Sequence, residues 1–210
     1  MKTNPGGVHQ IAAEEFDLRT AVGGPRGVLE SIAPVLIFLA VFLPTHRVGL
    51  AAIAALVVAS MLLAARLIAR TPITQALGGF LGVVICALWA WYSGRAADYF
   101  VPGLWINALY AIAMLGSIAI GYPLIGLIDA MIRGDSNWRT GPYLPRYRWV
   151  TALWAAMFGL RLAVQWPLYA TDNVAALGTA RLIMGVPLMA ATVFFSWLVL
   201  RRSHTNPREG

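Results

Sequence analysis

Long hydrophobic stretches alternate with short polar segments along most of the chain. A helix needs about 20 apolar residues to cross the hydrocarbon core of a bilayer. Stretches near this length lie at residues 27–44, 48–67, 74–92, 103–130, 149–170 and 175–200. The pattern predicts an all-α, polytopic membrane bundle of six transmembrane helices. We expect the bundle to occupy residues 26–202, with an N-terminal segment at 1–25 and a C-terminal tail at 203–210.

Proline residues fall inside several of these predicted helices. A proline removes one backbone donor and leaves the carbonyl four residues earlier without its helical partner. The four prolines are Pro34, Pro123, Pro167 and Pro187. They predict kinks, which either serve the packing alone or expose carbonyls beside a water-filled cavity.

Composition supports the membrane interpretation. Hydrophobic residues make up 59% of the chain and charged residues 12%, with a mean hydropathy of +0.69, which excludes a soluble globular domain. The net charge of +7 does not predict nucleic-acid binding, because the arginines lie between the apolar stretches. Twelve Lys and Arg residues fall on one predicted side, whereas the other side holds Arg47 and Arg95. The positive-inside rule therefore predicts a cytoplasmic (inner) membrane protein with both termini in the cytoplasm.

One arginine cassette occurs twice within apolar sequence. Arg161-Leu162-x4-Pro167-Leu168 is followed by Arg181-Leu182-x4-Pro187-Leu188. Counted from the turn near residues 171–173, both arginines reach a similar depth on neighbouring antiparallel helices. A cation in hydrocarbon costs several kcal/mol, so the pair predicts a nearby anion.

The identity of that anion has two explanations. Helical side chains lean toward the helix N-terminus, which favours salt bridges from Arg161 to Glu30 and from Arg181 to Asp172. Alternatively, at least one arginine binds a carboxylate, a phosphate or a lipid headgroup in a cavity open to the outside. In that case Asn107 and Gln165 are the expected orienting groups.

Enzymatic chemistry is not expected from the motifs. His9, His46 and His204 lie outside the apolar stretches, and no zinc, nucleophile-elbow or phosphate-loop motif occurs in the sequence. We therefore predict neither a cofactor nor a metal site, and no catalytic residues. Glycines in the third and fourth stretches predict close helix contacts. They are Gly78, Gly79, Gly82, Gly116, Gly121 and Gly126.

The two halves of the chain can be compared as inverted three-helix repeats. Ser31-Ile32-Ala33-Pro34 matches Ser117-Ile118-Ala119 followed by Pro123, and Arg66-Leu67-x4-Pro72-Ile73 matches the cassette that begins at Arg161. Chance similarity is the alternative in a chain rich in leucine, alanine and proline.

The longest connection, residues 133–148, interleaves four arginines with aromatic residues and faces the predicted cytoplasm. Such a segment either lies on anionic headgroups or docks a membrane protein partner. A homo-oligomer is a further expectation.

Several strings together resemble the actinobacterial membrane proteins grouped as domain of unknown function 3159. They include Gly94-Arg95-Ala96-x-Asp98-Tyr99-Phe100-x-Pro102-Gly103-x3-Asn107 and Phe158-x2-Arg161-x3-Gln165-x-Pro167-Leu168-Tyr169. The resemblance covers about residues 16–202 and implies six helices in the cytoplasmic membrane, without an agreed activity. A weaker architectural likeness to bacterial septation-type membrane proteins implies an envelope or division role.

The functional hypothesis is a small transporter or channel with a cationic cavity for an anionic solute or lipid headgroup. Its predicted ligand-binding residues are Arg161, Gln165, Arg181, Asn107 and Glu30. The alternative is a membrane scaffold or accessory subunit of an envelope, division or transport complex, with residues 133–148 as its contact surface. The two hypotheses differ in whether a water-filled path passes Arg161.

Overall fold

The computed structural model describes residues 24–70, 74–134 and 138–201, so most of both predicted terminal segments lies outside the described residues. The described residues form α-helices and one short 3-10 helix, η1 (Ala96–Phe100), which confirms the predicted all-α bundle. The helices are α3 (Gly24–Thr45), α4 (Val48–Ile68), α5 (Thr74–Ser93), α6 (Val101–Ala119), α7 (Leu124–Arg133), α8 (Leu144–Ala170), α9 (Val174–Ile183) and α10 (Val186–Arg201).

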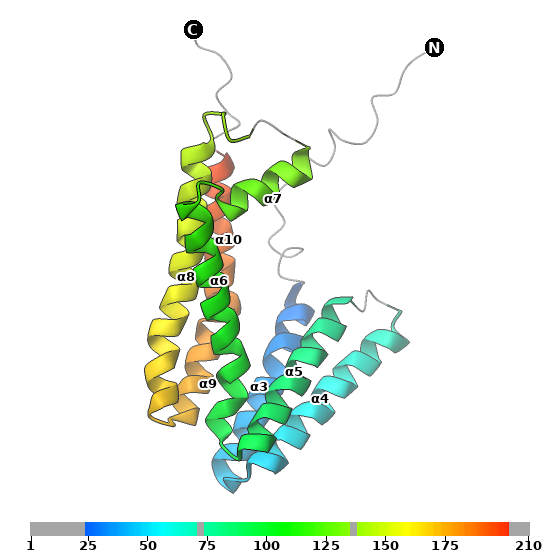
Figure 1. Cartoon of the computed structure of the whole chain (residues 1–210). Helices are drawn as coiled ribbons and strands as arrows, with labels where there is room; N and C mark the ends of the chain where they lie inside the picture. Colours follow the sequence, from blue (N-terminus) through cyan, green and yellow to red (C-terminus); the bar gives the residue numbers. More distant parts are fainter. Residues whose placement is uncertain (1–23, 71–73, 135–137, 202–210) are drawn as a thin grey trace, which may run out of the picture.

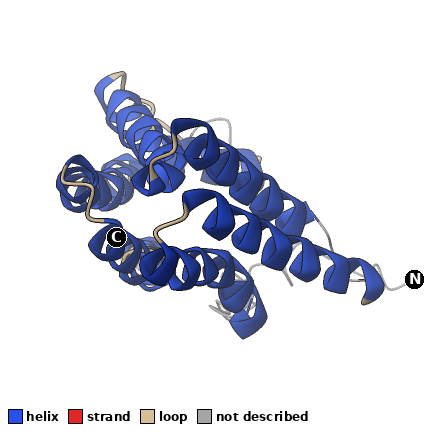
Figure 2. Cartoon of the chain, turned by 90° about the horizontal axis from the view of Figure 1, so that it is seen from below, coloured by secondary structure: helices blue, strands red, loops and turns tan. Residues whose placement is uncertain are grey.

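The helices pack in two groups. The first group contains α3, α4 and α5, with α4 in contact with both neighbours. The second group contains α6, α8, α9 and α10, and α7 packs across the end of α8 (Figure 1). Seen from below, some helices appear nearly end-on while others run obliquely to them (Figure 2). The first group therefore leans away from the second.

A shared core joins the two groups at one end. Phe38 of α3 stacks on Tyr99 of η1 with ring centroids 4.1 Å apart, and Phe100 meets Phe38 edge-on. Leu177 of α9 is buried in the same cluster, beside small residues of α4 and α5. Aromatic pairs of this kind contribute more than their buried area alone, and through them η1 links the two groups.

Two predicted membrane helices are in fact divided. The prediction of one helix over residues 103–130 is wrong, because Gly121 adopts a left-handed φ of +79° and α7 begins after Pro123 in a new direction. The first free amides of α7 are capped by side chains: Leu124 N–H donates to Ser117 Oγ at 3.1 Å. The predicted helix at 175–200 is likewise interrupted, at Met184 and Gly185.

Within the described part of the chain, three helical segments are long and apolar enough to cross a bilayer: Val48–Ile68, Ala96–Ala119 and Val174–Leu200. Shorter apolar helices cover Ile32–Thr45 and Leu77–Ser93. α8 is 27 residues long, but polar residues such as Arg161 and Gln165 lower its hydropathy. The chain thus has the character of a helical membrane protein, and the count of six spans stays a prediction.

The prediction of close glycine contacts is mostly wrong. A Cβ atom added at Gly78, Gly79, Gly82, Gly116 or Gly121 would meet nothing within 4 Å. Of the predicted set only Gly126 is tightly packed, against Trp138 and Tyr147. Close packing occurs instead at Gly103 and Gly178, which the pattern of neighbouring glycines did not indicate.

The proposed repeat pairs segments that differ locally. Pro34 lies inside the continuous helix α3, whereas Pro123 precedes the separate helix α7. Pro72 and Ile73 lie outside the described residues. The inverted repeat therefore stays a prediction.

Candidate functional site

Four of the five predicted site residues line one cavity of about 320 Å³ between the helix groups. Asn107 comes from α6, Arg161 and Gln165 from α8, and Arg181 from α9. We call this space the arginine cavity. Its lining, within the described part of the chain, contains no aspartate or glutamate.

Arg161 is held by the interruption between α9 and α10. Its Nη2 donates to the carbonyl oxygen of Gly185 at 2.8 Å, and its Nε is buried without a hydrogen-bond partner in the described structure. A buried donor left unpaired carries a desolvation cost of about 1–3 kcal/mol. The guanidinium group is therefore only partly satisfied by the protein.

Arg181 lies against the start of α6. Its Nη1 donates to the carbonyl of Phe100 over a long 3.4 Å, and the guanidinium carbon lies 5.6 Å from the Phe100 ring centroid. The group also packs directly on Gly103, where an added Cβ would collide with it. Gly103 thus creates the space in which this cation sits.

The two amides of the cavity are strongly buried. Gln165 is 3% exposed and Asn107 is 8% exposed. Both side chains line the arginine cavity. Their donors and acceptors are therefore available to water or a ligand.

Both predicted salt bridges are wrong. Glu30 forms an ion pair with Arg66 of α4 at 2.6 Å, not with Arg161. Asp172 lies 3.5 Å from Arg95, not beside Arg181. Glu30 pairs with Arg66 because α3 and α4 form an antiparallel hairpin, and its short turn at residues 46–47 places the start of α3 beside the end of α4.

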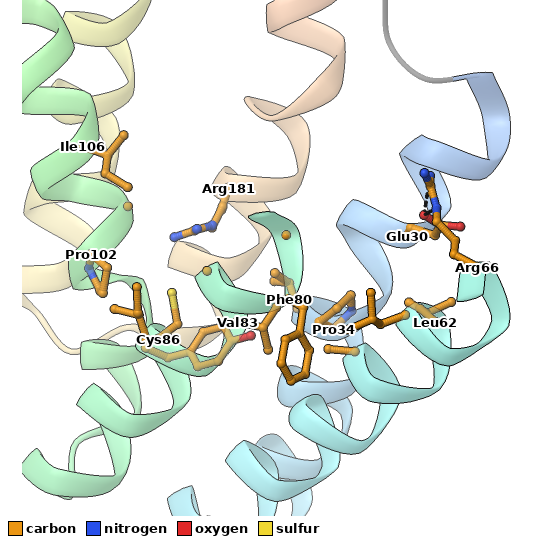
Figure 3. Close-up of a pocket in the computed structure, with 18 residues that line it drawn as sticks. Glu30, Pro34, Leu62, Arg66, Phe80, Val83, Cys86, Pro102, Ile106 and Arg181 are labelled. Atoms are coloured by element: carbon orange, nitrogen blue, oxygen red, sulfur yellow. Dashed lines mark hydrogen bonds and ion pairs between the residues drawn. The ribbon is translucent and has the colours of Figure 1, made fainter. Parts of the chain in front are cut away.

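The fifth predicted residue, Glu30, lines an adjoining cavity of about 480 Å³, which we call the apolar cavity. It lies between α3, α4, α5 and α6, and the two cavities share Val35, Gly103, Ile106 and Arg181. Figure 3 shows Arg181 on one side of the apolar cavity and the Glu30–Arg66 pair on the other. Arg66 and Gly103 are site residues that sequence reasoning did not select.

A family model described as "Protein of unknown function (DUF3159)" matches residues 22–207. The chain belongs to this family. The match confirms the resemblance predicted from the motifs, while the likeness to septation-type proteins stays a prediction. No curated protein and no solved structure matches the chain.

In this DUF3159 protein, the strings that carried the resemblance also build the site. The string from Gly94 to Asn107 forms η1 and the first turns of α6, including Gly103. The string from Phe158 to Tyr169 supplies Arg161 and Gln165. The motif residues therefore gather where the two helix groups meet.

The two charged residues of the Gly94–Asn107 string, Arg95 and Asp98, connect η1 to the end of α8 and to the turn that follows it. Tyr169 Oη donates to Asp98 Oδ1 at 2.9 Å, and Arg95 Nη1 lies 3.8 Å from the same oxygen. The carboxylate of Asp98 raises the pKa of Arg95, so this exposed arginine remains cationic. The cluster positions η1, and η1 supplies the Phe100 carbonyl that Arg181 contacts.

The predicted contact segment 133–148 is not all a loop, because Arg133 ends α7 and residues 144–148 begin α8. Trp138 and Tyr147 enclose Gly126, and Tyr147 Oη donates to Asp129 at 2.5 Å. Arg139 stacks on the ring of Tyr122 at 3.7 Å. These contacts lie away from the arginine cavity, so the segment and the cavity are separate features of the molecule.

Proposed function

We propose that this DUF3159 protein is a small transporter or channel that binds an anion between its two helix groups. The observation that carries the proposal is the arginine cavity, whose lining among the described residues contains Arg161 and Arg181 but no carboxylate. We propose the cytoplasmic membrane as its location, with both termini in the cytoplasm.

Electrostatics supports an anionic ligand. Two like charges in a medium of low dielectric repel one another, and backbone carbonyls carry only partial negative charge. Gly185 and Phe100 supply such carbonyls to Arg161 and Arg181. A carboxylate or phosphate would offset this positive charge and accept charge-assisted hydrogen bonds.

The divided helix supports a transport role. Broken membrane helices near a binding site are common in transporters, because the free backbone groups contact the solute. Here Gly185 lies at the interruption between α9 and α10 and presents its carbonyl to Arg161. Binding or release of the ligand would therefore act directly on the interruption between α9 and α10.

The test is anion flux through reconstituted protein. Proteoliposomes would be loaded with radiolabelled phosphate, sulfate or acetate, and efflux compared with empty liposomes. We expect flux of at least one anion, and we expect Arg161→Gln and Arg181→Gln to reduce it at least about tenfold, since each removes a charged hydrogen bond. Arg139→Gln is the matched control, because that exposed arginine contacts Tyr122 outside the cavity. Folded protein without flux of any of the three anions would contradict the proposal.

A scaffold role is the second candidate, and α7 is the observation that favours it. Met131 and Ile132 on this short helix are 76% and 80% exposed, next to the arginine-bearing segment. An apolar face beside cations fits an interfacial contact with lipid or with a membrane partner. A scaffold would retain its role after Arg161→Gln but lose it after Met131→Glu.

A further inference from the structure

The apolar cavity adjoins the arginine cavity, and the two share lining residues. Arg181 borders both spaces, together with Val35, Gly103 and Ile106. A ligand whose anionic group meets Arg181 can therefore extend into the larger space.

Between its charged ends, the larger space is lined by hydrocarbon. Figure 3 shows Arg181 at one side, the Glu30–Arg66 pair at the other, and Pro34, Phe80 and Leu62 among the residues between them. Glu30 and Arg66 form an ion pair at 2.6 Å. The middle of the cavity therefore favours apolar atoms over a second charge.

The wall formed by α5 is open. Gly79 and Gly82 line the apolar cavity, both are exposed, and a Cβ atom at either position would meet nothing within 4 Å. In a bilayer, an exposed apolar helix face lies among acyl chains. An acyl chain could enter the cavity at these glycines without displacing a protein side chain.

From this arrangement we infer that the ligand is an anionic amphiphile. Its phosphate or carboxylate binds Arg161 and Arg181, and its hydrocarbon chain occupies the apolar cavity beside Gly79 and Gly82. The inference rests on the proposed anion site and names the class of ligand that it takes.

The test compares anions that differ in chain length alone. Binding of inorganic phosphate, butyl phosphate and octyl phosphate would be measured on the purified full-length protein in one detergent. Each buried methylene strengthens binding roughly fourfold, so we expect octyl phosphate to bind at least about tenfold more tightly than butyl phosphate. Arg181→Gln should weaken the binding of all three.

Two matched glycine variants test where the hydrocarbon chain of the ligand lies. Gly82→Leu places a side chain in the apolar cavity, whereas Gly78→Leu adds the same side chain one turn away, at a position that does not line it. We expect Gly82→Leu to reduce the preference for octyl over butyl phosphate to less than about threefold while inorganic phosphate still binds. Gly78→Leu should leave the preference unchanged.

The outcomes separate this inference from the proposed function. Equal binding of all three phosphates, abolished by Arg181→Gln, would retain the anion site and overturn the amphiphile. If none of the three phosphates bound, both the anion site and the amphiphile inference would be overturned. If Gly82→Leu and Gly78→Leu reduced the preference for octyl over butyl phosphate equally, the amphiphile inference would also be overturned. That result would indicate that this face of α5 contacts another protein.

Discussion

Gly103 lies directly beneath the guanidinium group of Arg181, and this contact determines where the cation sits. The arginines of the site could be predicted from sequence, because a charge inside an apolar stretch is conspicuous. Gly103 could not be, since its role depends on a side chain 78 positions later in the chain. The ion pairs were mispredicted for a similar reason. Depth and side-chain direction did not reveal that Arg66 lies closer to Glu30 than Arg161 does.

The first prediction concerns Gly103. Gly103→Ala should displace the Arg181 guanidinium and weaken anion binding about tenfold, because a hydrogen bond to a charged group contributes about 1.5–3 kcal/mol. The measurement is the anion dissociation constant. Gly116→Ala is the control on the same helix, since a Cβ atom there meets nothing within 4 Å. Equal binding by both variants would show that the position of Arg181 does not matter.

The second prediction concerns the ion pairs. Glu30→Gln removes the carboxylate that Arg66 contacts in a largely buried setting, and should lower the free energy of unfolding by about 3–5 kcal/mol. Asp172→Asn removes an exposed pair with Arg95 but leaves the contact between Arg95 and Asp98, and should change the free energy of unfolding by less than about 1 kcal/mol. Thermal unfolding of the purified variants measures both. Similar midpoints for the two variants would contradict the structural role of the Glu30–Arg66 pair.

At the scale of helices, proline alone did not predict where the chain breaks. Pro34 and Pro167 lie inside continuous helices, whereas α7 and α10 begin next to Pro123 and Pro187. Both interrupted positions read Gly-x-Pro, as Gly121-Tyr122-Pro123 and Gly185-Val186-Pro187. A glycine lowers the cost of leaving the helix, and the proline two positions later removes a donor that would continue it. This spacing could have been recognised in the sequence, whereas the new direction of α7 depends on packing against Trp138 and Tyr147.

The third prediction tests the interruption between α9 and α10. A Cβ atom at Gly185 would lie 2.9 Å from the backbone oxygen of Arg181, so Gly185→Ala must shift the backbone there. We expect a several-fold loss of anion flux, because the Gly185 carbonyl that Arg161 contacts would move. Gly159→Ala, at an open position of α8, is the control and should keep full flux. An unaffected Gly185→Ala protein would show that the interruption is not part of the site.

At the scale of the whole molecule, hydropathy was sufficient to predict an all-helical membrane protein, because long apolar helices have few alternatives in a bilayer. It did not reveal that the helices form two groups joined through η1, since that arrangement depends on contacts such as Phe38 with Tyr99. The adjoining cavities lie between these groups and bring Asn107, Arg161, Gln165 and Arg181 together. The central claim is that water and an anion reach these residues.

The most direct test of that claim is thiol labelling of Gln165→Cys and Asn107→Cys in a Cys86→Ser background. A membrane-impermeant reagent would be added from each side of the membrane in turn. We predict labelling of both positions from at least one side, slowed by phosphate or octyl phosphate, with the protection lost when Arg181→Gln is added. Absence of labelling from either side in well-folded protein would contradict the account and indicate a dry core.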